Sequence, residues 1–84
     1  MTVYILHSNA LGRYYVGMTQ ALMIRLRQHN SPRKHWTAQA DDWRVVWSQE
    51  VASRAAAREL EVQIKGRGAA RWLAGQAPQN AGQA

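Results

Sequence analysis

Residues 2–17 read TVYILHSNALGRYYVG, and this stretch decides how the chain begins to fold. The β-branched, aromatic and aliphatic side chains of residues 2–7 favour a strand. These positions alternate little between polar and apolar, which indicates a strand buried on both faces. Asn9 and Gly12 accept the backbone angles of a turn, and residues 13–17 return as a second strand. The stretch therefore predicts an antiparallel hairpin.

Helices and one more strand are predicted beyond the hairpin. In chain order they are a helix over residues 20–30, a polar loop over 31–42, a strand over 43–50, a helix over 54–65 and a short helix over 68–74. Thr19 and Ser53 are the expected N-caps of the first two helices. Gly66 and Gly68 are expected to break the second helix, and the tail from Gly75 is expected to be disordered. A small sheet with helices packed on it is an α+β architecture.

Composition narrows the functional classes. The chain has 84 residues, enough for one domain, and no cysteine, which excludes a disulfide scaffold and a thiolate metal site. Its net charge is +6, and none of its five acidic residues lies within residues 1–40. With a sequence pI of about 10.9, this arginine-rich chain favours nucleic acid as a partner. No apolar run or basic leader predicts a membrane span or a signal peptide, so a cytoplasmic location is expected.

Five side chains carry groups suited to phosphodiester hydrolysis. They are Tyr4, Tyr15, Arg25, His29 and Glu61. Such a set offers a base for water, a guanidinium for charge on the phosphorus oxygens and one carboxylate for a divalent metal. The phosphate-loop, zinc-protease and nucleophile-elbow motifs are missing. Spacing alone leaves open whether the five side chains converge.

These residues and their spacing resemble the GIY-YIG nuclease family, in its compact stand-alone branch. Tyr4, after Val3, and the Tyr15-Val16-Gly17 triplet look like the two halves of the motif that names the family. Arg25 follows Tyr15 by ten residues, and His29 follows Arg25 by four, as the family helix requires. Glu61 lies in a later helical segment of matching pattern. The resemblance covers residues 2–74, so we expect a domain over 1–74 and a tail over 75–84.

The resemblance implies a fold, an activity and a cofactor. The fold would be a three-stranded antiparallel sheet flanked by helices. The activity would be endonucleolytic hydrolysis of DNA phosphodiester bonds with one Mg²⁺ or Mn²⁺, in DNA repair or processing. Gly17 would let the backbone turn closely into the helix. The leading glycine of the first motif is Thr2 here, which bears on the level of activity.

The resemblance also implies a role for each candidate residue. Tyr4 would be the general base on the attacking water, and Tyr15 would orient the water or the scissile phosphate. Arg25 would stabilise the charge that develops on the phosphorus oxygens. His29 would relay a proton or hold Tyr4. Glu61 would ligate the metal ion.

Each candidate also has a purely structural interpretation. The two tyrosines could be core aromatics with satisfied hydroxyls, and His29 could favour the negative end of its helix dipole. Glu61 could simply pair with Arg58 or Lys65, an interaction worth about 0.3–0.5 kcal/mol.

Three basic residues are candidate phosphate contacts, namely Arg27, Arg33 and Lys34. The alternative function is a nucleic-acid-binding module of the same fold that has lost turnover. Branched or nicked DNA and RNA are both open as partners, and so are a monomer and a homodimer.

Overall fold

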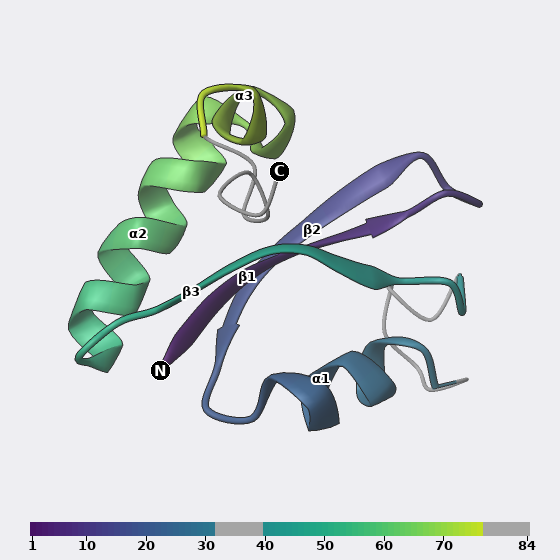
Figure 1. Cartoon of the computed structure of the whole chain (residues 1–84), viewed down its shortest axis with the longest axis horizontal. Helices are drawn as coiled ribbons and strands as arrows, with labels where there is room; N and C mark the ends of the chain where they lie inside the picture. The colour runs from purple at the N-terminus through teal and green to yellow at the C-terminus, as the bar shows by residue number, and fades with distance from the viewer. Residues whose placement is uncertain (32–39, 77–84) are drawn as a thin grey trace, which may run out of the picture.

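The computed structural model describes residues 1–31 and 40–76 (Figure 1). Their elements are β1 (Thr2–Ser8), β2 (Arg13–Thr19), α1 (Leu22–His29), β3 (Arg44–Glu50), α2 (Arg54–Arg67) and α3 (Ala69–Ala74). The strands form one antiparallel sheet in the order β2-β1-β3. The predicted α+β fold, a small three-stranded antiparallel sheet flanked by helices, is thus confirmed. The tail is expected to be disordered from Gly75, but the N–H groups of Gly75 and Gln76 bond back to carbonyls of α3. Residues 77–84 lie outside the described residues.

Strand β1 lies at the centre of the molecule because it is the middle strand of the sheet and both faces of the sheet are covered. Val3 and Ile5 point towards α2 and α3, whereas Tyr4 and Leu6 point towards α1. Figure 1 shows α1 on one side of the sheet and the other two helices on the opposite side. All four β1 side chains are at most 1% exposed, which explains why the strand shows no polar alternation.

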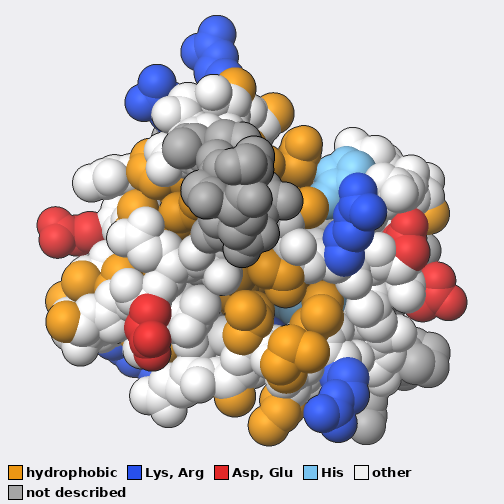
Figure 2. All heavy atoms as spheres, viewed as in Figure 1, with side chains coloured by type: hydrophobic (Ala, Val, Ile, Leu, Met, Phe, Trp, Pro, Cys, Tyr) orange, Lys and Arg blue, Asp and Glu red, His pale blue; other side chains and the backbone are white. Residues whose placement is uncertain are grey.

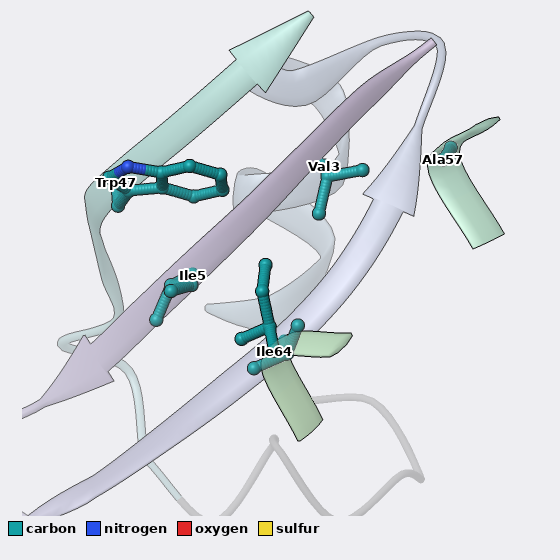
Figure 3. Close-up of a cluster of buried hydrophobic side chains, with 6 residues drawn as sticks. Val3, Ile5, Trp47, Ala57 and Ile64 are labelled. Atoms are coloured by element: carbon teal, nitrogen blue, oxygen red, sulfur yellow. The ribbon is translucent and has the colours of Figure 1, made fainter. Parts of the chain in front are cut away.

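The larger core lies between the sheet and α2. Figure 3 shows its main members converging from three elements: Val3, Ile5, Trp47, Ala57 and Ile64. Ala57 and Ile64 are separated by two helical turns, so they lie on one face of α2. Full burial of a valine or isoleucine side chain, as at Val3, Ile5 and Ile64, contributes about 1.5–3 kcal/mol to folding.

A β-bulge divides β3 between the two cores. Ile5 pairs with Trp47, but the next β1 residue, Leu6, pairs with Val45, so Val46 is the extra residue. The bulge interrupts the alternation of β3. Residues two apart on a regular strand share a face, but here Trp47 packs in the α2 core and Val45 in the α1 core. Strand β3 begins at Arg44, one residue later than predicted.

The ends of the helices differ in part from the prediction. Ser53 caps α2 as expected, since its side chain accepts a hydrogen bond from the Ala56 N–H at 3.1 Å. Gly66 does not break α2, which runs to Arg67 and ends at Gly68, where φ is +92°. Thr19 ends β2 and does not cap α1.

Helix α1 is shorter than the predicted range 20–30, because it begins at Leu22 and ends at His29. Ala21 takes the N-cap position and makes no side-chain capping bond. The Thr19 hydroxyl instead accepts from the Ala21 N–H at 3.1 Å, which shapes the turn between β2 and the helix.

The β1–β2 turn is tied to the segment before β3. Asp42 accepts hydrogen bonds from the Ser8 hydroxyl at 2.5 Å and from the Ala10 N–H at 2.9 Å. The bond from Ser8 and the backbone donors lower the pKa of the Asp42 carboxyl. Gly12, at φ +63°, closes the turn with a bond from its N–H to the Ser8 carbonyl.

Candidate active site

Tyr4 and His29 meet in the interior between β1 and α1. They are 25 residues apart in sequence, and a hydrogen bond of 3.0 Å joins Tyr4 Oη to His29 Nε2. Tyr4 is 1% exposed and His29 2%. A histidine this deeply buried is held by its partners, so its position at the end of α1 reflects more than the helix dipole.

Gly17 provides the space for the Tyr4 ring. It pairs with Tyr4 across the β1–β2 ladder. A Cβ at this position would lie 2.7 Å from Tyr4 Oη, 2.9 Å from Tyr4 Cζ and 3.0 Å from Tyr15 Cε2. Any larger residue would therefore force the tyrosine away. The expected role of Gly17, a close turn into the helix, is wrong: Gly17 lies inside β2, and its role is to accommodate the two tyrosines.

Tyr15 joins the same cluster from the edge strand of the sheet. Its ring centroid lies 4.5 Å from that of His29 and 6.3 Å from that of Tyr4. Unlike Tyr4, it is only partly buried. The three rings thus form one aromatic cluster that reaches from the interior to the open edge of β2.

Arg25 and Glu61 act electrostatically on this cluster from two different helices. Burial raises the pKa of the Tyr4 hydroxyl, and hydrogen bonding to the Arg25 guanidinium opposes that rise. The charges of Tyr15 and Glu61 raise the pKa further. The interaction with Tyr4 in turn raises the pKa of Arg25. His29, Tyr15 and Arg25 therefore contact or interact with the Tyr4 side chain, and the charge of Glu61 acts on it from α2.

Glu61 lies on α2, and its carboxylate forms an ion pair with Lys65. Glu61 Oε2 lies 3.1 Å from Lys65 Nζ, and the Glu61 side chain is 17% exposed. The alternative that Glu61 pairs with Lys65 is thus realised, and the charge of Glu61 also acts on Tyr4.

Asn30 is a positioning residue whose role was not predicted. Its side chain donates to the Trp43 carbonyl at 3.0 Å and accepts from the Trp43 N–H at 2.8 Å. The Asn30 amide thus bonds both backbone groups of Trp43, as a neighbouring strand would. These bonds hold the end of α1, next to His29, against the residue that precedes β3. The only sequence signal was an asparagine directly after the helical histidine.

Of the three predicted phosphate contacts, Arg27 lies within the described residues. Arg27 lies on an exposed position of α1. Arg33 and Lys34 fall outside the described residues.

A comparison with protein-family models matches residues 1–73 to the GIY-YIG catalytic domain. The match spans most of the chain and includes Tyr4, Tyr15, Arg25, His29 and Glu61. This chain belongs to the GIY-YIG family. Comparisons with curated proteins and with solved structures gave no match.

Membership in the GIY-YIG family indicates nuclease-type chemistry on nucleic acid, and such nucleases generally use a divalent metal. Within residues 1–31 and 40–76, no three His, Cys, Asp or Glu side chains converge. One carboxylate nevertheless fits Mg²⁺, which keeps several waters and takes further oxygens from substrate phosphates. Among the five candidate residues Glu61 is the one that carries a carboxylate, so it is the residue that would hold such an ion. In the same part of the chain, no helix has the length and apolar character of a membrane span.

Proposed function

We propose that this GIY-YIG protein is a divalent-metal-dependent endonuclease that hydrolyses DNA phosphodiester bonds, in DNA repair or processing. The observation that carries the proposal is the Tyr4 hydroxyl, hydrogen-bonded to His29 and under the charges of Arg25 and Glu61. In-line attack of water on a phosphodiester needs a base, a cation and, for a metal ion, a carboxylate, and these residues supply groups of each kind. The cytoplasmic location stays a prediction from the sequence.

Tyr4 and His29 are proposed to remove the proton from the attacking water together. Because burial raises the pKa of Tyr4, its hydroxyl stays protonated at neutral pH. It can accept a proton from water only if its own proton passes to His29 Nε2, 3.0 Å away, at the same time. Burial also restricts the exchange to a water held with the substrate.

Tyr15 and Arg25 are proposed to hold the scissile phosphate. Tyr15 is partly exposed at the sheet edge and interacts with Arg25, so the pair is proposed to face the phosphate or the water together. Arg25 lies on an exposed face of α1 and interacts with both tyrosines, which directs its charge to the same place. Removing a donor of this kind commonly lowers turnover about 100- to 1,000-fold.

Glu61 is proposed to hold one Mg²⁺ or Mn²⁺ ion. When bound, such an ion neutralises charge on the phosphate and stabilises the leaving oxygen. Glu59, two residues earlier, lines a different hollow with Ala55 and Val62. It therefore offers a matched carboxylate that should have no part in the reaction.

The test is a cleavage panel of linear, nicked and branched DNA, with RNA as a comparison, in Mg²⁺, Mn²⁺ or EDTA. The parent and Glu59→Gln should cut, EDTA should abolish cutting, and Glu61→Gln, Tyr4→Phe and Arg25→Gln should each lose at least about 100-fold. Equal activity of Glu61→Gln and Glu59→Gln would refute the assignment of Glu61.

The second candidate is a nucleic-acid-binding module of the same fold without turnover. The Glu61–Lys65 ion pair favours it, because a lysine ammonium already occupies the carboxylate that would hold the metal. Thr2 does not disturb the fold, since it pairs regularly with Thr19 and Glu50. Salt-sensitive DNA binding with no cleavage of any substrate in Mn²⁺ would establish this candidate.

A further inference from the structure

A hollow of about 680 Å³ opens next to the tyrosine cluster, between β2 and the junction of α2 with α3. Its lining includes Tyr14 and Tyr15 from the strand and Lys65, Arg67 and Arg71 from the helices. None of the five residues of the candidate site except Tyr15 belongs to it. The volume lies within the range of sites that hold a ligand of nucleotide size.

The helical wall of the hollow is strongly basic. Lys65, Arg67 and Arg71 lie within seven residues, all three are exposed, and no acidic residue is part of the lining. In Figure 2, Lys and Arg side chains project at the end of the molecule that α3 occupies in Figure 1. Arginine side chains in this arrangement suit a phosphate, which they can bind through paired N–H groups.

The strand wall offers an aromatic surface. Tyr14 is 39% exposed, although it is a large side chain on a strand. Its ring packs against His7, its partner across the β1–β2 ladder, with ring centroids 4.7 Å apart. The contact with His7 supports the ring from one side and leaves part of it exposed at the hollow. A supported, exposed aromatic ring beside a basic wall is the combination that binds unpaired bases.

Two contacts connect the hollow to the candidate site. Tyr15 lines the hollow, and its ring packs 4.5 Å from that of His29. Lys65 also lines it and forms the ion pair with Glu61. A group bound in the hollow would therefore touch Tyr15 and Lys65, each of which contacts another residue of the candidate site.

We propose that this hollow binds one unpaired nucleotide of the substrate, next to the scissile phosphodiester. The base stacks on Tyr14, and the phosphate is bound by Arg67 and Arg71. Inside a duplex both faces of a base are covered by its neighbours, so Tyr14 can stack only on a base outside the helix. The inference rests on the proposed function and adds to it a substrate class: nucleic acid with an unpaired nucleotide at the cleavage position.

The test measures binding in EDTA, where no metal-dependent cleavage occurs. Fluorescence anisotropy compares a labelled single-stranded oligonucleotide with the same sequence in a duplex. Tyr14→Ala should weaken single-strand binding about tenfold and leave duplex binding unchanged, whereas Tyr14→Phe should bind like the parent. A 2-aminopurine base in the oligonucleotide should lose fluorescence on binding to the parent, and less on binding to Tyr14→Ala.

The contribution of the basic wall is tested by comparing single-strand binding of Arg71→Gln with that of Arg58→Gln. Arg58 lines a different hollow of α2, so both variants lose one arginine but only the first changes the proposed subsite. Arg71→Gln should weaken single-strand binding several-fold more than Arg58→Gln. Equal effects of the two variants, or equal binding by Tyr14→Ala and the parent, would overturn the inference. If Tyr14→Ala does not fold, Tyr14→Leu replaces it.

Cleavage is scored separately, on the same oligonucleotide in Mn²⁺. Cutting by a parent whose binding does not depend on Tyr14 would leave the proposed function standing and refute the subsite. Tyr14-dependent binding without any cutting would support the subsite and refute the proposed endonuclease.

Discussion

At Gly17, the absence of a side chain leaves the space that the Tyr4 ring occupies. Gly17→Ala would place a methyl group 2.7 Å from Tyr4 Oη, so the ring must move and its bond to His29 must lengthen. We expect a loss of about 1–3 kcal/mol in the free energy of unfolding and a large loss of cleavage. Urea unfolding and a cleavage assay on the same preparation measure both.

Gly66→Ala is the matched control. Gly66 lies inside α2, and an added Cβ would meet no atom within 4 Å. Alanine should therefore stabilise the helix by about 0.5–1 kcal/mol and leave cleavage unchanged. If both alanine variants lower stability alike, the space at Gly17 is not specific to Tyr4.

If Glu61 holds the metal ion, Lys65 competes with that ion for its carboxylate. An i,i+4 pair is worth about 0.3–0.5 kcal/mol, so Lys65→Gln should tighten Mn²⁺ binding about twofold. Titration of the free-Mn²⁺ electron paramagnetic resonance signal, without DNA, measures this directly. Lys65→Arg keeps the ion pair and should resemble the parent. Weaker Mn²⁺ binding by the glutamine variant would place the metal elsewhere.

The raised pKa of Tyr4 predicts how the pH dependence changes when His29 is lost. In the parent, the Tyr4 proton passes to His29, so cleavage should vary little between pH 8 and 9. In His29→Ala, Tyr4 must first lose its proton to solvent. Because burial raises the pKa of Tyr4, the tyrosinate fraction in this pH range rises about tenfold per pH unit. The rate of the variant should rise equally steeply, and a flat profile for both proteins contradicts the relay.

Among the elements, the end of α1 is joined to the segment before β3 by the side chain of Asn30. Asn30 makes two hydrogen bonds to the backbone of Trp43 and places His29 beside Tyr4. Asn30→Ala leaves both backbone groups without these partners and should cost about 1–3 kcal/mol of unfolding free energy. Gln20→Ala, at an exposed position before α1, is the control.

A cleavage assay on Asn30→Ala and Gln20→Ala tests whether Asn30 also positions His29. Asn30→Ala should lose cleavage even at a temperature where circular dichroism shows it fully folded, because α1 no longer holds His29 in place. Full activity of the folded variant would limit Asn30 to a role in stability.

At the scale of the whole molecule, a net charge of +6 on 84 residues predicts binding dominated by phosphate contacts. For about four neutralised phosphates, DNA affinity should fall about a hundredfold between 50 and 200 mM salt. Arg27→Gln should lower the slope of log K against log salt by about one if Arg27 contacts a phosphate. An unchanged slope for Arg27→Gln would remove Arg27 from the interface.

Much of the fold follows from patterns that are local in the chain. The apolar run of β1, the turn at Gly12 and the cap at Ser53 each depend on neighbours a few residues away, and the structure confirms them. The spacing of Tyr4, Tyr15, Arg25, His29 and Glu61 identified the family for the same reason, because it is a property of the chain itself.

The geometry of the site depends on packing between distant segments. The approach of Tyr4 to His29 across 25 residues requires the strand order β2-β1-β3 and α1 on one face of the sheet. Gly17 faces Tyr4 only through that strand pairing. The bonds of Asn30 to β3 and the basic hollow beside Tyr14 likewise join elements far apart in sequence. Periodicity and capping report short-range preferences, whereas these contacts form only when the two cores assemble.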